Sequence, residues 1–134
     1  MIRYMLDSSF CIDVMRDKTE TLREKFKINS SQMAISTIVL HELFFGAANN
    51  PEPERARKKV EKFCTGVSVL DFDDNAAAHA GDIRADLRRK GQTIGGYDTL
   101  IAGHARSLGL TVVTGNLREF TRVDGLRCED WLAQ

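Results

Sequence analysis

Short apolar runs alternate along the chain with longer stretches in which apolar residues recur every three or four positions. The short runs predict buried strands at residues 2–6, 33–35, 67–70 and 110–113, with a weaker edge strand at 126–128. The longer stretches predict helices over residues 10–16, 20–27, 38–48, 54–64, 74–89 and 97–107. This alternation predicts one α/β domain over residues 1–134, with a central, mostly parallel sheet of about four to five short strands flanked by helices.

Residues with short polar side chains mark the starts of several helices. Ser8 or Ser9 is expected to cap the first helix, and Thr19 to begin the second after a break at residues 17–19. Ser36 and Asp73 are expected to cap the helices that follow them.

Two acids lie among apolar residues of the predicted helices. Glu42 has Ile38, Val39 and Phe45 at the helical spacings i−4, i−3 and i+3, and Asp98 is followed by apolar residues at i+3, i+4 and i+7. Both acids are therefore expected to face inward, where a carboxylate is rarely found without a partner. The alternatives are a buried salt bridge for Glu42 and stabilisation of the helix N-terminus for Asp98.

Further polar groups follow the ends of predicted strands. Asp7 comes directly after the first strand, and Asn116 lies just past the strand at 110–113, with Glu119 three positions further on. In open α/β sheets, ligands bind outside the carboxyl ends of strands. The ordinary alternatives are a helix N-cap for Asp7, a turn for Asn116 and an ion pair with a neighbouring arginine for Glu119.

Together these groups favour a metal site. Carboxylates that converge repel one another, and a hard cation relieves the repulsion. Oxygen ligands without a cluster of His or Cys suit Mg²⁺ or Mn²⁺. The sequence therefore predicts that Asp7, Glu42 and Asp98 hold Mg²⁺ or Mn²⁺, with Asn116 or Glu119 as a fourth site residue.

Composition narrows the class of protein. The chain carries 19 basic and 19 acidic residues, so no net charge draws it towards a polyanion. The three cysteines have no paired spacing, which is typical of a reducing compartment. No apolar run approaches the roughly 20 residues of a membrane span, and no leader segment is evident. We therefore expect a cytoplasmic protein without a membrane partner.

Four segments, in order and spacing, resemble the PIN-domain nucleases. They are Met5–Ser9, Ile35–Gly46, Tyr97–Ala102 and Thr114–Phe120. Within these nucleases the chain is similar to the VapC toxins of VapBC toxin–antitoxin systems, and the resemblance covers residues 1–134 as one PIN domain. It implies an endoribonuclease that depends on Mg²⁺ or Mn²⁺ and cuts a structured RNA, expected to be tRNA, to inhibit translation.

The resemblance also implies partners and further site residues. A VapB-type antitoxin is expected to bind the toxin, which would form a homodimer within a larger hetero-oligomer. The family's acids fall on Asp7, Glu42 and Asp98, with Asn116 or Glu119 at the fourth position. Supporting polar residues fall on Ser8, Ser9 and Thr114. Since the net charge is zero, RNA affinity depends on local cations, for which we expect Arg3, Arg84, Arg88 and Arg89.

Two other functions stay open on the sequence. A phosphoacceptor receiver module would have a similar length, a parallel sheet and an acidic Mg²⁺ pocket, with Asp71 as the acceptor after the strand at 67–70. It would also need a late lysine, and no lysine follows residue 90. A generic metal-dependent phosphodiesterase is the second alternative, and the comparison of RNA with DNA as substrate distinguishes it.

Overall fold

The computed structural model describes residues 1–16 and 20–131. Its centre is a five-stranded sheet in which all neighbouring strands run parallel. In spatial order the strands are β3 (Ser68–Leu70), β2 (Met33–Ser36), β1 (Tyr4–Leu6), β4 (Thr111–Val113) and β5 (Cys128–Glu129). The predicted parallel sheet is confirmed, with strand ends that shift by one or two residues.

Seven helices surround the sheet in the described residues. They are α1 (Ser8–Met15), α2 (Glu20–Asn29), α3 (Thr37–Ala48), α4 (Pro53–Cys64), α5 (Asp74–Arg89), α6 (Gly96–Leu108) and α7 (Leu117–Phe120). The expected caps Ser36 and Asp73 are confirmed, because their side chains accept hydrogen bonds from backbone N–H groups at the starts of α3 and α5. The expected start of α2 at Thr19 lies outside the described residues. None of these helices is long and apolar enough to cross a membrane.

The order of the strands sets the place of the site. The chain builds β1, β2 and β3 outward on one side of the sheet and then returns to add β4 and β5 on the other side. In open α/β sheets, ligands bind outside the carboxyl ends of the two strands where the direction changes, which are β1 and β4 here. Asp7 follows β1 and donates its backbone N–H to Val113 O at 3.0 Å, so the ends of these strands are joined.

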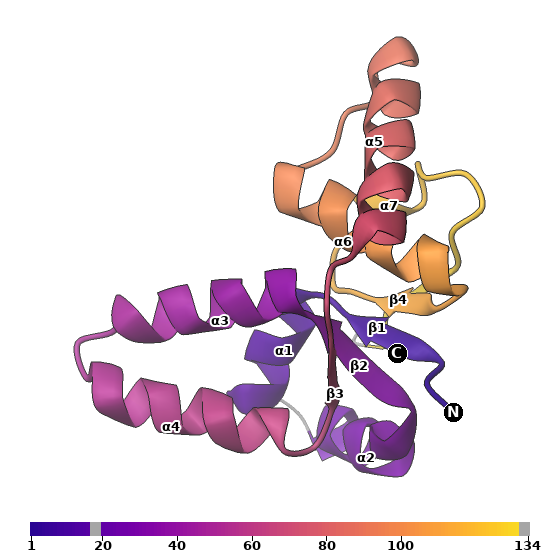
Figure 1. Ribbon diagram of the computed structural model, residues 1–134. Helices are drawn as coiled ribbons and strands as arrows, with labels where there is room; N and C mark the ends of the chain where they lie inside the picture. Colours follow the sequence, from indigo (N-terminus) through magenta and orange to yellow (C-terminus); the bar gives the residue numbers. More distant parts are fainter. Residues whose placement is uncertain (17–19, 132–134) are drawn as a thin grey trace.

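Two pairs of helices flank the sheet. α3 and α4 form a hairpin that projects from the sheet, and α5 and α6 pack together above it in the view of Figure 1. The core lies between the strands and the helices, and Met5, Ile35 and Val112 are fully buried in it. Trp131 belongs to this core and packs edge-on against the rings of Tyr4 and Phe10, with ring centroids 5.1 and 5.6 Å apart.

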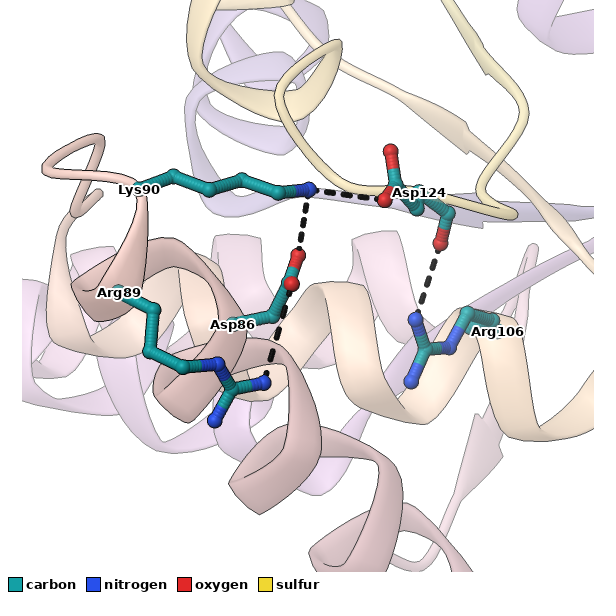
Figure 2. Close-up of polar contacts among 5 residues, drawn as sticks. All are labelled: Asp86, Arg89, Lys90, Arg106 and Asp124. Atoms are coloured by element: carbon teal, nitrogen blue, oxygen red, sulfur yellow. Dashed lines mark hydrogen bonds and ion pairs between the residues drawn. The ribbon is translucent and has the colours of Figure 1, made fainter.

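Charged side chains fasten the loop after α7 to the end of α5 (Figure 2). Lys90 Nζ lies 2.9 Å from a carboxylate oxygen of Asp86 and 2.9 Å from one of Asp124. Arg106 of α6 donates to the backbone oxygen of Asp124 at 2.9 Å. These contacts tie α5, α6 and the segment after α7 to one another, and so hold together the elements that carry Asp98 and Glu119.

Candidate active site

Asp7 is the most firmly held of the predicted site residues. Its side chain is 3% exposed, and one oxygen, Oδ1, accepts hydrogen bonds from the backbone N–H of Phe10 and the hydroxyl of Ser9, both at 2.9 Å. The other oxygen, Oδ2, accepts a hydrogen bond of 2.5 Å from the Thr114 hydroxyl. Burial raises the pKa of Asp7 above its usual value, while these three hydrogen bonds act in the opposite direction.

The expectation that Ser8 or Ser9 caps α1 is wrong. Asp7 itself is the N-cap, with an extended backbone at φ −81° and ψ 170°, and α1 begins at Ser8. The reason is geometric: the residue after a strand is still extended, which is the conformation that an N-cap requires. Ser9 instead supports the Asp7 carboxylate, while Ser8 donates to Glu42 Oε2 at 3.2 Å.

Thr114 joins the ends of β1 and β4 through its side chain. The residue is fully buried, and its hydroxyl donates to Asp7 while accepting the backbone N–H of Asn116 at 2.8 Å. A short hydrogen-bonded chain therefore runs from the turn after β4 to the carboxylate after β1.

Glu42 enters the site from α3 and lies at the edge of that helix's buried face. Val39, Leu43 and Ala47 form the buried face. Phe45 is 66% exposed, so the prediction that Phe45 shares an inward apolar face with Glu42 is wrong. The half-buried Glu42 keeps one oxygen, Oε1, away from solvent with no hydrogen-bond partner among the described residues. Burial is the main cause that raises the pKa of Glu42, and the negative charge of Asp7 adds to it.

Asp98 enters from the first turn of α6 and meets Glu119 of α7. Burial is the main cause that raises the pKa of Asp98 from 3.8 to about 7, and the hydrogen bond with Glu119 and the charges of Asp7, Glu119 and Glu42 act in the same direction. Near neutral pH the Asp98 carboxyl group therefore still holds its proton in part. Asn116 donates its side-chain amide to Glu119 Oε2 at 2.9 Å. Of the two candidates for the fourth position, Glu119 touches Asp98, and Asn116 holds Glu119.

The structure therefore brings four carboxylates together, those of Asp7, Glu42, Asp98 and Glu119. The charges that contribute most to these pKa values are mostly those of other acids, and none belongs to a lysine or arginine of the described residues. As the side chains lie, no three His, Cys, Asp or Glu of the described residues form a group that encloses a metal ion. Uncompensated charge, hard oxygen donors and the unpartnered Glu42 Oε1 nevertheless fit a divalent cation.

The four arginines expected at the RNA lie in different places. Arg3 precedes β1 at the amino end of the sheet, on the edge opposite Asp7, which gives no support to a contact with RNA bound at the acids. Arg84 and Arg88 are exposed on α5 and form no ion pair within the described ranges. Arg89 lies 3.8 Å from Asp86 in an exposed ion pair (Figure 2).

A cleft lies between α5 and the start of α6, next to Arg84. It has a volume of about 860 Å³, and Arg84 and Tyr97 are among its lining residues. Tyr97 adjoins Asp98, and its ring centroid lies 6.0 Å from that of His41, which adjoins Glu42. Tyr97 was not predicted as a site residue, because an exposed tyrosine next to an acid has no distinctive spacing.

Comparison with known proteins gives consistent results. The PIN domain profile matches residues 4–126. The chain is 52% identical over 131 residues to the tRNA(fMet)-specific endonuclease VapC of Salmonella typhimurium, covering 98% of this chain and 99% of the relative. It is 48% identical to the protein of the same name from Shigella flexneri, with the same coverage. The crystal structure of DNA-bound VapBC from Salmonella typhimurium superposes with a TM-score of 0.94 at 52% identity, covering 98% of this chain and 99% of that one.

Proposed function

Because the chain belongs to the PIN-domain family, and within it to the VapC ribonucleases of toxin–antitoxin systems, we propose that it is a Mg²⁺- or Mn²⁺-dependent endoribonuclease that cuts tRNA. The observation that carries the proposal is the meeting of four carboxylates at the switch point of the sheet, where no lysine or arginine of the described residues forms an ion pair with them. This membership also removes the receiver module as an alternative, and Asp71 lies outside the group of acids, exposed after β3.

Asp7, Glu42 and Asp98 would hold the cation, and Glu119 is the better candidate for the fourth ligand because it contacts Asp98 directly. A divalent cation at this position supplies a water of lowered pKa and compensates negative charge at the phosphate. Asn116 would act as a support, since its amide is committed to Glu119.

The chain's own residues prepare the site in two ways. Ser9, Thr114 and the N-terminus of α1 fix the Asp7 carboxylate, so it needs no rearrangement before it acts. Asp98, in contact with Glu119, holds a proton in part near pH 7 because its pKa is raised, and this proton must leave when a cation binds. Cation binding and activity are therefore expected to strengthen as the pH rises towards 8.

The relatives suggest the substrate and the partner. Two of them are named as tRNA(fMet)-specific endonucleases, and solved structures of others contain VapBC complexes. We infer that a tRNA is the substrate here, and that a VapB-type antitoxin binds a homodimer of this chain in a hetero-oligomer. A tRNA substrate and the absence of spanning helices in the described residues both agree with a cytoplasmic location.

The decisive experiment compares cleavage of RNA by the wild-type chain and by Asp7→Asn. Asn caps a helix as well as Asp does, so this variant removes the charge and keeps α1, whereas Asp7→Ala would also lose a cap worth about 0.5–2 kcal/mol. Asp73→Asn is the matched control, because Asp73 caps α5 in the same manner and lies outside the acids. Cleavage is followed on tRNA with Mg²⁺ or Mn²⁺ and with EDTA.

Asp7→Asn is expected to lose cleavage, and Asp73→Asn to keep it. Equal rates for the wild type and Asp7→Asn would exclude the proposed site. Unchanged cleavage in EDTA would exclude the metal, and equal cleavage of DNA and RNA would favour the generic phosphodiesterase.

A further inference from the structure

Tyr97 and His41 form an aromatic pair at the mouth of the group of acids. Their ring centroids are 6.0 Å apart, and the ring planes meet at 40°. Tyr97 stands immediately before Asp98 on α6, and His41 immediately before Glu42 on α3. The pair therefore spans the gap between the two helices that deliver these acids.

Packing does not account for the pair. Tyr97 is 49% exposed, His41 is also exposed, and no hydrogen bond in the described part of the chain involves the Tyr97 hydroxyl. A ring pair this open stabilises the fold less than a buried pair would, because water still covers much of both rings. His41 packs against one side of the tyrosine and leaves the rest of the ring free.

Tyr97 also lines a cleft that is large enough for a nucleotide. The cleft lies between α5 and α6, has a volume of about 860 Å³, and its walls include Phe72, Leu87 and Ile94. Arg84 lines the same cleft. A molecule bound in this cleft would meet an aromatic side chain, apolar side chains and a cation, and the residue that follows Tyr97 is the acid Asp98.

We propose that Tyr97, oriented by His41, stacks an unpaired nucleobase of the RNA next to the phosphodiester bond that the site cuts. This inference rests on the proposed ribonuclease function and specifies its substrate as RNA with an unstacked base at the cut. A base within a duplex is covered by its neighbours and cannot lie on a side chain, whereas a base in a loop can. Stacking on an aromatic side chain accepts every base, so Tyr97 selects unpaired structure rather than sequence.

The experiment uses the full chain and a hairpin RNA with one 2-aminopurine in its loop or, in a second RNA, in its stem. Binding is titrated in EDTA, where quenching of 2-aminopurine fluorescence reports stacking, and KM and kcat are then measured with Mg²⁺ or Mn²⁺. The variants are Tyr97→Leu and Tyr97→Phe. The matched control is Leu108→Ala, which alters a residue of α6 that is also 49% exposed but lies at the other end of the helix.

Wild type and Tyr97→Phe are expected to quench the loop probe and not the stem probe, and Tyr97→Leu to lose the quenching. Loss of one stacked base raises KM by roughly 5- to 100-fold, with kcat little changed because the stack contributes equally to substrate and transition state. Leu108→Ala stays at the wild-type values.

Each other outcome has a definite meaning. Loop quenching and a KM that are the same in wild type and Tyr97→Leu overturn the stacking role, and so does the absence of quenching by the wild type. Quenching by the wild type without any cleavage in the presence of metal leaves the stacking role standing and overturns the ribonuclease function instead.

Discussion

Thr114 supports the Asp7 carboxylate from the end of the neighbouring strand. Its hydroxyl donates to Asp7 and accepts from the backbone of Asn116, so Thr114→Val leaves both groups without their partner while keeping the shape of the side chain. Because a lost support of a metal-binding carboxylate typically costs 10- to 100-fold in affinity or activity, we expect a fall of about that size in kcat/KM.

The control for this variant is Thr111→Val, at the start of β4, the strand that Thr114 follows. Thr111 is also buried, but within the described residues its hydroxyl has only a hydrogen bond of 3.5 Å from Arg127. RNA cleavage by Thr111→Val is expected to match the wild type. If Thr114→Val cleaves equally well and melts at the same temperature, the hydroxyl does not prepare Asp7.

Asp98 gives the metal-free protein a characteristic pH dependence. The pKa of Asp98 is about 7 in the folded chain and near 3.8 in the unfolded chain, so between these values the folded chain holds a proton that the unfolded chain has lost. The contribution of this proton to stability is complete below about pH 4 and is lost as the pH rises through 7.

In EDTA, the melting temperature of the wild type is therefore expected to fall between about pH 5 and pH 8, relative to that of Asp98→Asn, whose amide does not titrate. Mg²⁺ is expected to raise the melting temperature of the wild type more at pH 8 than at pH 6. Parallel curves for the two proteins in EDTA would show that Asp98 keeps an ordinary pKa.

The acids on helices were easier to predict from the sequence than the groups at strand ends. Glu42 and Asp98 stand at helical spacings from apolar residues, and a carboxylate on an apolar face is rarely found without a partner. The sequence could not say whether Asn116 or Glu119 contacts Asp98, because no local pattern encodes a contact between residues of two separate helices.

At the scale of elements, α5 and α6 cross in close contact at Gly103. A Cβ atom added there would stand 2.5 Å from the backbone nitrogen of Ala80 and 2.6 Å from its Cα. Backbone cannot yield as a side chain does, so Gly103→Ala is expected to force the helices apart and to destabilise the fold by about 1–3 kcal/mol. Urea denaturation followed by circular dichroism measures this.

Gly81→Ala is the matched control, since Gly81 lies within α5 and a Cβ there has nothing within 4 Å. Alanine is favoured over glycine inside a helix, so this variant is expected to be more stable than the wild type by up to about 1 kcal/mol. A Gly103→Ala protein as stable as Gly81→Ala would mean that the two helices separate without cost.

The helices and strands themselves were largely predictable, because residues with recognisable side chains mark many of their ends. Ser36 and Asp73 mark helix starts, and Gly109 ends α6 with a left-handed backbone at φ 68°. The orientation of a helix was less predictable: α3 is apolar on more than one side, and the exposed Phe45 shows that composition alone does not say which side meets the sheet.

At the scale of the whole molecule, the strand order β3-β2-β1-β4-β5 could not be predicted from the sequence. Alternation of strands and helices predicts a parallel sheet, but the point at which the chain turns back depends on long-range packing. That reversal places β1 beside β4 and so makes one site from residues that are 107 positions apart, Asp7 and Thr114.

The arrangement of the helices decides which exposed cations can contact a bound RNA, although the chain has no net charge. Arg84 lines the cleft between α5 and α6, and Arg88 lies one turn further along α5. Lys58 and Lys59 are exposed on α4, which lies on the far side of α3 in Figure 1. If RNA follows the cleft, only the arginines contact phosphates. Arg84→Ala and Arg88→Ala are then expected to weaken binding of all RNAs, and each to lower the slope of log affinity against log salt by about 1.

Lys58→Ala and Lys59→Ala serve as controls, because they remove the same charge from a helix outside the cleft and are expected to leave that slope unchanged. Affinities are measured in EDTA over a range of salt concentrations, so that no RNA is cut. A slope that falls for the α4 variants and not for the α5 variants would place the RNA across α3 and α4. The bound strand would then reach the acids without passing Tyr97, and the stacking of a base there would be lost with it.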